Sequence, residues 1–100
     1  MTGSLTIIIP AFNESKRISN SLKDIDEYIS RKSKAGIFYV IVVDDGSIDD
    51  TASMVKKHFP TVQLIKKKHT GKSASLNAGI ARAKGELIAV IDGDIQIEGS

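Results

Sequence analysis

The fold is decided by Phe38-Tyr-Val-Ile-Val-Val-Asp-Asp45, in which six apolar residues stand in an unbroken row before two acids. A strand with one face in water alternates apolar and polar residues, whereas a parallel strand covered on both faces is apolar throughout. The row therefore predicts a central strand over Phe38–Val43. The acids that close it do not suit an apolar core, and we expect Asp44 and Asp45 to be solvated or bound to a ligand.

Shorter apolar runs lie on both sides of this strand, and each is followed by a segment with helical spacing. Strands are predicted at Leu5–Ile9, Val62–Ile65 and Leu87–Ile91. Helices are predicted from about Glu14 to Lys34 with Gly36 as the stop, from after Asp49 or Asp50 to before Pro60, and over Ser73–Lys84 with Gly85 directly after the last turn. This alternation is typical of a Rossmann-like parallel half-sheet with the order β-α-β-α-β-α-β. Right-handed crossovers then favour the spatial strand order 3-2-1-4.

Composition restricts the classes of protein that remain. The 100 residues suffice for one domain, 1–100, and 41% hydrophobic with 26% charged residues is typical of a globular chain. A net charge of +2 does not predict nucleic-acid binding, and the absence of Cys excludes a thiolate zinc site or a cysteine nucleophile. The apolar runs are shorter than the roughly 20 residues of a spanning helix, and no signal peptide is recognisable, so we expect a cytoplasmic location.

A ligand site is predicted where the strand order reverses, at the carboxyl ends of the first and fourth strands. Three polar segments follow predicted strands there: Pro10-Ala-Phe-Asn-Glu14, Asp44-Asp-Gly-Ser47 and Asp92-Gly-Asp94. Asp92 and Asp94 place two carboxylates close together, and such a pair suits a hard divalent cation, Mg²⁺ or Mn²⁺, with Gln96 as a third oxygen ligand. A turn whose aspartates bond backbone amides is the open alternative.

The other polar residues also have two interpretations. Asp44 and Asp45 would accept hydrogen bonds from a nucleobase or ribose, or would help to cap the second helix. Lys72 stands in Thr70-Gly-Lys-Ser73, which imitates the end of a P-loop but has Lys66 where the first Gly belongs. Lys72 could still face a phosphate at a helix N-terminus. We expect the preceding residues to form a solvated basic loop with an incidental histidine: Lys66, Lys67, Lys68 and His69.

Taken together, four segments resemble the family 2 glycosyltransferases in order and spacing. They are Ile9-Pro-Ala-Phe-Asn-Glu14, Val42-Val-Asp-Asp-Gly-Ser47, Gly71-Lys-Ser-Ala-Ser-Leu-Asn-Ala-Gly79 and Ile91-Asp-Gly-Asp94. The resemblance covers nearly the whole chain and corresponds to the nucleotide-sugar-binding half of the GT-A fold. The stretch from Asp92 to Gln96 is most similar to that of dolichyl- or polyprenyl-phosphate sugar synthases, while Lys72–Asn77 also resembles processive polysaccharide synthases.

The resemblance implies a role for each matching residue. Pro10, Ala11 and Glu14 would line the nucleotide pocket, Asp45 with Asp44 would contact base or ribose, and Lys72 would lie near the nucleotide. Asp92 and Asp94, with Gln96, would hold Mg²⁺ or Mn²⁺ against the diphosphate of a UDP- or GDP-linked sugar. The implied reaction transfers the sugar, with inversion, to an acceptor such as a polyprenyl phosphate or a polysaccharide.

The sequence also departs from the family. Family members continue beyond the metal motif into a segment that supplies the acceptor site and, in most members, a catalytic base, whereas this sequence ends at Ser100. We therefore expect a donor-binding half that is inactive by itself, from a parent enzyme associated with a membrane. Leu87–Ile91 would form an open edge strand and predicts self-association. The competing hypothesis is a non-catalytic folded interaction module in which the acids are helix caps.

Overall fold

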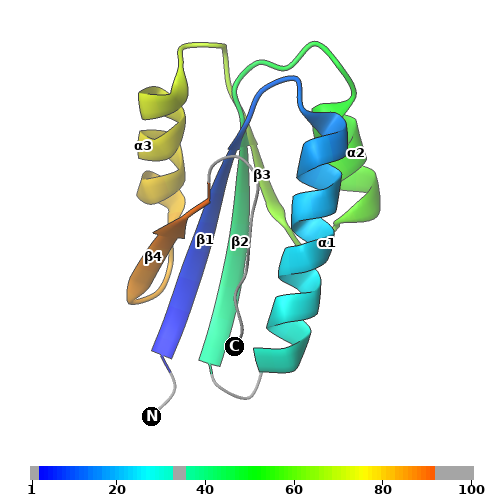
Figure 1. Cartoon of the computed structure of the whole chain (residues 1–100). Helices are drawn as coiled ribbons and strands as arrows, with labels where there is room; N and C mark the ends of the chain where they lie inside the picture. The colour runs from blue at the N-terminus through cyan, green and yellow to red at the C-terminus, as the bar shows by residue number, and fades with distance from the viewer. Residues whose placement is uncertain (1–2, 33–35, 92–100) are drawn as a thin grey trace.

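The structure, a computed structural model, describes residues 3–32 and 36–91. Within them strands and helices alternate: β1 (Gly3–Ala11), α1 (Ser15–Lys32), β2 (Gly36–Asp44), α2 (Thr51–His58), β3 (Gln63–Lys66), α3 (Lys72–Arg82) and β4 (Leu87–Val90). Every strand pair is parallel, and the order across the sheet is β3-β2-β1-β4 (Figure 1). The predicted Rossmann-like topology and the order 3-2-1-4 are confirmed.

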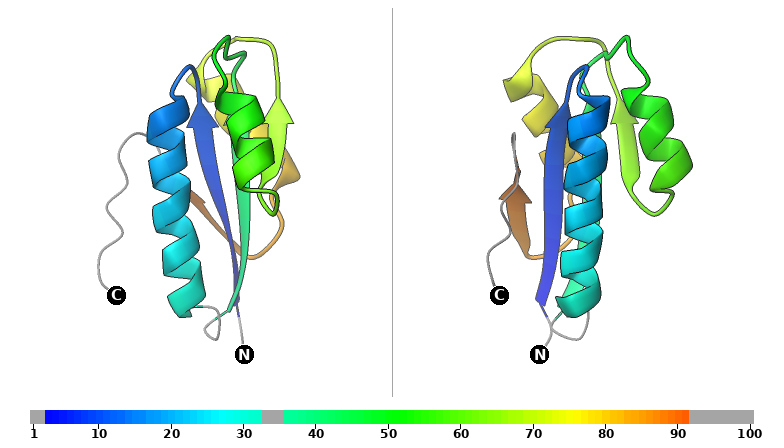
Figure 2. Two further views of the ribbon diagram at one scale, coloured as in Figure 1. Left: turned by 90° about the vertical axis from the view of Figure 1, so that its right-hand side faces the viewer. Right: turned by 45° about the vertical axis from the view of Figure 1, so that its right-hand side comes forward.

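Helices cover both faces of the sheet, with α1 and α2 on one face and α3 on the other (Figure 2). Alternate residues of each central strand point to opposite faces. Ile7, Ile9 and Val42 therefore belong to the core under α1 and α2, whereas Ile8 and its neighbours on β2 pack with residues of α3. Both faces of β1 and β2 are buried, and this is why the sequence of β2 shows no alternation.

Two glycines were interpreted differently from what the structure shows. Gly36 does not end α1: it is the first residue of β2 and pairs with Gly3. A Cβ at Gly36 would lie 2.6 Å from the carbonyl oxygen of Gly3, so the absence of a side chain allows the strands to approach. At the other end of the chain, α3 ends at Arg82, three residues before Gly85, which has a φ of +100°.

The helices and strands bring several loops to one edge of the sheet. The carboxyl ends of β1, β2 and β3 point the same way, and the loops after them meet at the top of Figure 1. Within residues 3–32 and 36–91, no helix combines the length and the apolar character needed to span a bilayer.

Candidate functional site

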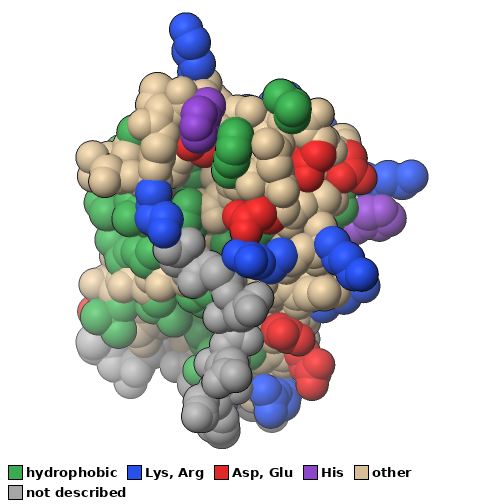
Figure 3. Space-filling model, turned by 45° about the horizontal axis from the view of Figure 1, so that its top comes forward, with side chains coloured by type: hydrophobic (Ala, Val, Ile, Leu, Met, Phe, Trp, Pro, Cys, Tyr) green, Lys and Arg blue, Asp and Glu red, His purple; other side chains and the backbone are tan. Residues whose placement is uncertain are grey.

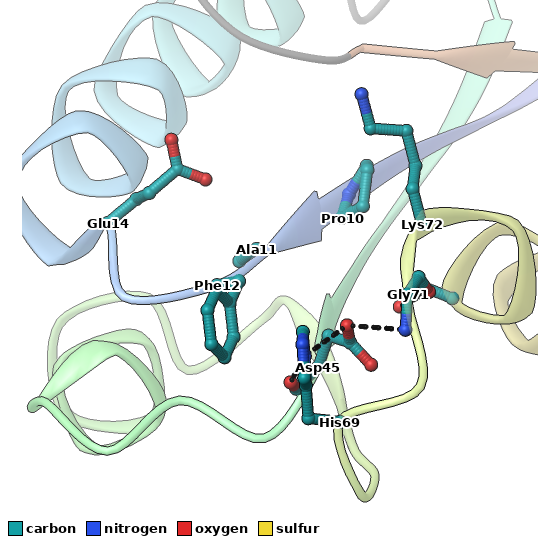
Figure 4. Close-up of a pocket in the computed structure, with 9 residues that line it drawn as sticks. Pro10, Ala11, Phe12, Glu14, Asp45, His69, Gly71 and Lys72 are labelled. Atoms are coloured by element: carbon teal, nitrogen blue, oxygen red, sulfur yellow. Dashed lines mark hydrogen bonds and ion pairs between the residues drawn. The ribbon is translucent and has the colours of Figure 1, made fainter.

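A cavity of about 220 Å³ opens where these loops meet. It is lined by residues from β1 and the loop after it, from the loop after β2, from the loop between β3 and α3, and from the start of α3: Pro10, Ala11, Phe12, Glu14, Asp45, His69, Gly71, Lys72 and Ser75. Figure 4 shows Glu14 and Lys72 on opposite sides of this space, with Phe12 and His69 side by side between them. The structure thus brings together five residues that the sequence predicted for a nucleotide pocket: Pro10, Ala11, Glu14, Asp45 and Lys72.

Asp45 holds the loop that connects β3 to α3, residues 67–71, which we call the β3–α3 loop. Its Oδ1 accepts hydrogen bonds from Lys67 Nζ and from the backbone N–H of Thr70, the latter at 3.0 Å. Its Oδ2 accepts one from the backbone N–H of Gly71 at 3.0 Å and lies 2.8 Å from His69 Nδ1. All four donors belong to the same short loop, so one carboxylate fixes the wall of the cavity next to α3.

The environment of Asp45 keeps its carboxylate ionised. Burial alone would raise the pKa of this group. The hydrogen bond from Lys67 Nζ and those from the N–H groups of Thr70 and Gly71 outweigh burial, and they hold the pKa well below its usual 3.8. Lys67 Nζ also donates to the carbonyl of Lys68 and to Thr70 Oγ1, so this ammonium group is bound inside the loop.

Two expectations about these residues were wrong in part. Ligand binding, the alternative given for Asp44 and Asp45, stays a prediction, and Lys66, Lys68 and His69 are exposed as expected. Asp44 and Asp45 are not solvated: they are 2% and 5% exposed. Their burial is tolerated because the carboxylates accept hydrogen bonds, for Asp44 from the N–H of Ser47 at 3.1 Å. Likewise the β3–α3 loop is not simply a solvated basic segment, since Lys67 and His69 both contact Asp45.

Asn13 connects the loops that follow β1 and β2. Its Oδ1 accepts hydrogen bonds from the N–H of Ile48 at 2.8 Å and of Asp49 at 3.4 Å, while its own N–H donates to Ser47 Oγ at 2.8 Å. Asn13 has a φ of +50°, a conformation that Asn adopts more readily than most residues. Asp49 in turn accepts a hydrogen bond from the N–H of Ser15, the first residue of α1. These contacts fix the loop that carries Glu14.

The two charged residues at the mouth of the cavity come from helix starts. Glu14 directly precedes α1 and forms an ion pair with Arg17, with 2.6 Å between Oε2 and Nη1. Lys72 is the first residue of α3, and its side chain is exposed. Acidic and basic side chains are both present on this side of the molecule (Figure 3), so the surface does not have the single sign that a nucleic-acid site needs.

Of the other predicted site residues, Asp44 alone is among those that the structure describes. Asp44 does not line the cavity. Its Oδ1 accepts a hydrogen bond from the N–H of Ser47, in the turn after β2. Asp92, Asp94 and Gln96, the predicted metal ligands, lie outside the described residues. Among the described residues, no cluster of three or more acidic, His or Cys side chains could hold a metal ion.

The sequence interpretation did not assign four of the lining residues to the site: Phe12, His69, Gly71 and Ser75. Phe12 stands inside the quoted segment after β1, and His69 was taken as incidental. Their rings are stacked, with 4.2 Å between centroids and 21° between planes. An aromatic residue two positions after Pro10 was a usable signal, but the partner of His69 depends on how the β3–α3 loop folds over the end of β2.

Comparison with known proteins identifies the family of this chain. The model of Glycosyl transferase family 2 matches residues 6–100. The dolichyl-phosphate beta-glucosyltransferase ALG5C of Trichomonas vaginalis is 38% identical over 96 residues, which are 89% of this chain and 28% of that protein. The human dolichyl-phosphate beta-glucosyltransferase is 31% identical over 104 residues, 93% of this chain and 32% of that protein.

A solved structure agrees with these relatives. The mannosyltransferase PcManGT of Pyrobaculum calidifontis, in complex with GDP-Man and Mn²⁺, superposes with a TM-score of 0.73 at 31% identity, over 92% of this chain and 28% of that one. The chain therefore spans less than a third of the length of each of these proteins. The family match over residues 6–100 and the shared parallel sheet show that this chain belongs to glycosyltransferase family 2 and has the corresponding part of the GT-A fold.

Proposed function

We propose that this chain is the donor-binding part of a family 2 glycosyltransferase, and that its cavity binds the nucleoside diphosphate of a UDP- or GDP-linked sugar. One observation carries the proposal. Five residues that the family resemblance assigns to the nucleotide pocket come from three separate segments and line one cavity: Pro10, Ala11, Glu14, Asp45 and Lys72. A cavity at the carboxyl ends of parallel strands, beside the point where the strand order reverses, is where open α/β sheets bind ligands.

The chemistry of the lining suits such a ligand. The Lys72 ammonium, at the first turn of α3, would attract the diphosphate, and the positive end of the helix dipole supports the same charge. Asp45 supplies carboxylate oxygens for a base or ribose, and Pro10 with Phe12 supplies apolar surface. These groups bind and orient the donor, and the catalytic base is proposed to lie in a segment beyond Ser100.

A divalent cation completes the proposed site. Asp92 and Asp94, with Gln96, would hold Mg²⁺ or Mn²⁺, since paired carboxylates and an amide oxygen are ligands that these ions accept. When bound, the cation neutralises the charge that develops on the nucleoside diphosphate as it leaves. In the sequence this motif directly follows Ile91, the last residue that the structure describes. The N–H of Ile91 donates a hydrogen bond to the carbonyl of Ile8 on β1 at 2.9 Å.

The acceptor is proposed from the relatives. Both of the relatives compared above are dolichyl-phosphate beta-glucosyltransferases, so we propose a lipid phosphate as the acceptor of the whole enzyme. We expect this chain alone to bind nucleotide and to transfer no sugar. A transfer assay with a polyprenyl-phosphate acceptor tests this expectation, and measurable product would contradict it.

The decisive experiment is a calorimetric titration of the chain with UDP and with GDP, each with and without Mn²⁺. We expect one nucleotide to bind in the presence of the metal, and the binding to be lost in Asp94→Ala. Asp50→Ala is the matched control, because Asp50 is an exposed acid outside the cavity that makes no side-chain cap of α2.

The outcomes separate the two hypotheses for this chain. Binding that requires the metal, is lost in Asp94→Ala and persists in Asp50→Ala supports a donor site. If neither nucleotide binds under any condition, the donor-site proposal fails and the non-catalytic interaction module is favoured. Equal loss in both variants would mean that Asp94 has no specific role.

A further inference from the structure

His69 makes two contacts that a nucleobase would be expected to make in this cavity. Its ring lies against the ring of Phe12, with 4.2 Å between centroids and 21° between planes. Its Nδ1 lies 2.8 Å from Asp45 Oδ2 and 3.0 Å from the backbone carbonyl of the same residue. A flat ring stacked on an aromatic side chain, with a ring nitrogen at a carboxylate, is also how proteins bind planar heterocycles. We call the surface formed by the Phe12 ring and the Asp45 carboxylate the ring site.

The carboxylate of the ring site is held more firmly than the imidazole that contacts it, whereas the Phe12 ring is 39% exposed. Asp45 is 5% exposed, and Lys67, Thr70 and Gly71 each donate a hydrogen bond to its carboxylate. The His69 side chain, in contrast, is 56% exposed. Exposed side chains change rotamer on a fast timescale. The imidazole can therefore leave the ring site by rotation about its side-chain bonds, without movement of the buried carboxylate.

The backbone of His69 is held in place while the ring is movable. Gly46, with a φ of +79°, lies so close to His69 that a Cβ on Gly46 would be 2.7 Å from the backbone nitrogen of His69. The neighbouring N–H groups of Thr70 and Gly71 are bound to Asp45. The β3–α3 loop consequently keeps the imidazole near the cavity whether or not it occupies the ring site.

A second ring cannot share this position. At 4.2 Å the Phe12 and His69 rings are in contact, so no other ring fits between them. Both oxygens of Asp45 already accept two contacts each from the β3–α3 loop. Of these four donors, His69 is the one on an exposed side chain, so it is the one that a ligand can replace at least cost.

We propose that His69 sets the nucleotide affinity of this cavity by occupying the ring site, and that a nucleobase binds there by displacing the imidazole. This inference rests on the proposed function, because it requires the cavity to take a nucleotide. Because the imidazole must leave before the nucleobase binds, the apparent affinity for nucleotide is reduced to the fraction of molecules in which the ring site is open. If the ring site is open in one-tenth of the molecules, the apparent affinity is about tenfold weaker. Removing the ring is therefore expected to tighten binding by about three- to tenfold.

The test compares His69→Ala with the unchanged chain by calorimetric titration of UDP and GDP in Mg²⁺. His58→Ala is the matched control, since His58 is the other histidine of the sequence and is exposed at the end of α2, away from the cavity. We expect tighter binding for His69→Ala and unchanged binding for His58→Ala. In parallel, NMR on the unchanged chain should show a nuclear Overhauser effect between the Phe12 and His69 rings that disappears when nucleotide binds.

Each outcome decides the proposal. If the unchanged chain binds nucleotide and His69→Ala binds equally well or more weakly, the role of His69 is refuted while the donor site stands. If only His69→Ala binds nucleotide, both the donor site and the role of His69 are supported. If neither chain binds nucleotide, both proposals are refuted. Should His69→Ala fail to fold, the NMR experiment decides, and a Phe12–His69 effect that persists at saturating nucleotide overturns the proposal.

Discussion

Asp45 shows how one buried residue can organise the wall of a cavity. A carboxylate that is 5% exposed would be costly without compensation, because burial removes its hydration. Here the cost is offset by an ammonium group and by two backbone N–H groups from the β3–α3 loop. Those same bonds determine where Gly71 stands and where α3 starts. The charge of Asp45 therefore supports both the stability of the chain and the shape of the cavity.

The pH dependence of stability tests this role. Because the folded-state pKa of Asp45 lies below the usual 3.8, its stabilising contribution is complete above that value and is lost as the pH falls through the folded-state pKa. We expect Asp45→Asn to reduce the free energy of unfolding at pH 7 by about 1–3 kcal/mol. The difference between the variant and the unchanged chain should then shrink as the pH falls below about 4.

Urea unfolding at pH 7 and at pH 3 measures this difference. Asp24→Asn, which changes an exposed acid on α1, serves as the control and should behave like the unchanged chain at both pH values. A difference for Asp45→Asn that is the same at pH 7 and pH 3 would show that the charge of the carboxylate is not what stabilises the loop.

At this scale the sequence predicted residue positions better than residue contacts. Pro10, Ala11, Glu14, Asp45 and Lys72 were assigned to one site, and they do line one cavity. The partners of Asp45 were not predictable, because the β3–α3 loop contacts it across 22 or more positions of sequence. Sequence patterns over a few residues do not reveal such a contact. The burial and the hydrogen bonds of Asp45 could therefore not be predicted.

Among the elements, α3 depends on a close approach to the sheet. Gly79 lies in the interior of this helix and is buried. A Cβ at this position would stand 2.6 Å from Cγ2 of Ile8 and 3.3 Å from Cγ2 of Val43. Both neighbours are fully buried β-branched residues of the central strands, with little freedom to move aside. The glycine therefore permits the packing that positions Lys72 over the cavity.

Gly79→Val should consequently destabilise the chain. Overpacking of a dense core costs about 1–3 kcal/mol, which exceeds the few tenths that Val regains over Gly in helix propensity. Chemical denaturation gives the free energy of unfolding. Ala81→Val is the matched control, because Ala81 is exposed on the same helix and its replacement costs only helix propensity, about 0.5 kcal/mol. Equal losses in the two variants would mean that α3 does not need the close approach.

The elements themselves were largely predictable. Short apolar runs rich in β-branched residues located all four described strands. The helical spacing that predicted α1 comes from apolar residues that are buried, among them Ile18, Leu22 and Ile25. The boundaries were less accurate, as Gly36 shows. A glycine after a helical pattern usually ends the helix, but this one is needed where two strands begin side by side, and that requirement arises only from tertiary pairing.

For the molecule as a whole, the edge of the sheet at β4 is the feature that bears on self-association. In the part of the chain that the structure describes, β4 pairs with β1 alone. Three of its side chains are substantially exposed, Leu87 at 65%, Ile88 at 46% and Val90 at 45%. An apolar strand with one unpaired row of backbone groups is a template for pairing with another strand.

We therefore expect this chain to self-associate through β4, and Ile88→Lys to prevent it. A lysine on an edge strand opposes pairing because the joined sheet would bring its charged side chain against the side chains of the second strand and remove water from it. Static light scattering at rising concentration should give an increasing mass for the unchanged chain and a constant monomer mass for Ile88→Lys. Ile48→Lys makes the same replacement at a 93% exposed loop position and should associate like the unchanged chain. An unchanged chain that remains monomeric at high concentration would contradict the prediction. If Ile48→Lys abolishes association as completely as Ile88→Lys, the association depends on net charge and not on the β4 edge.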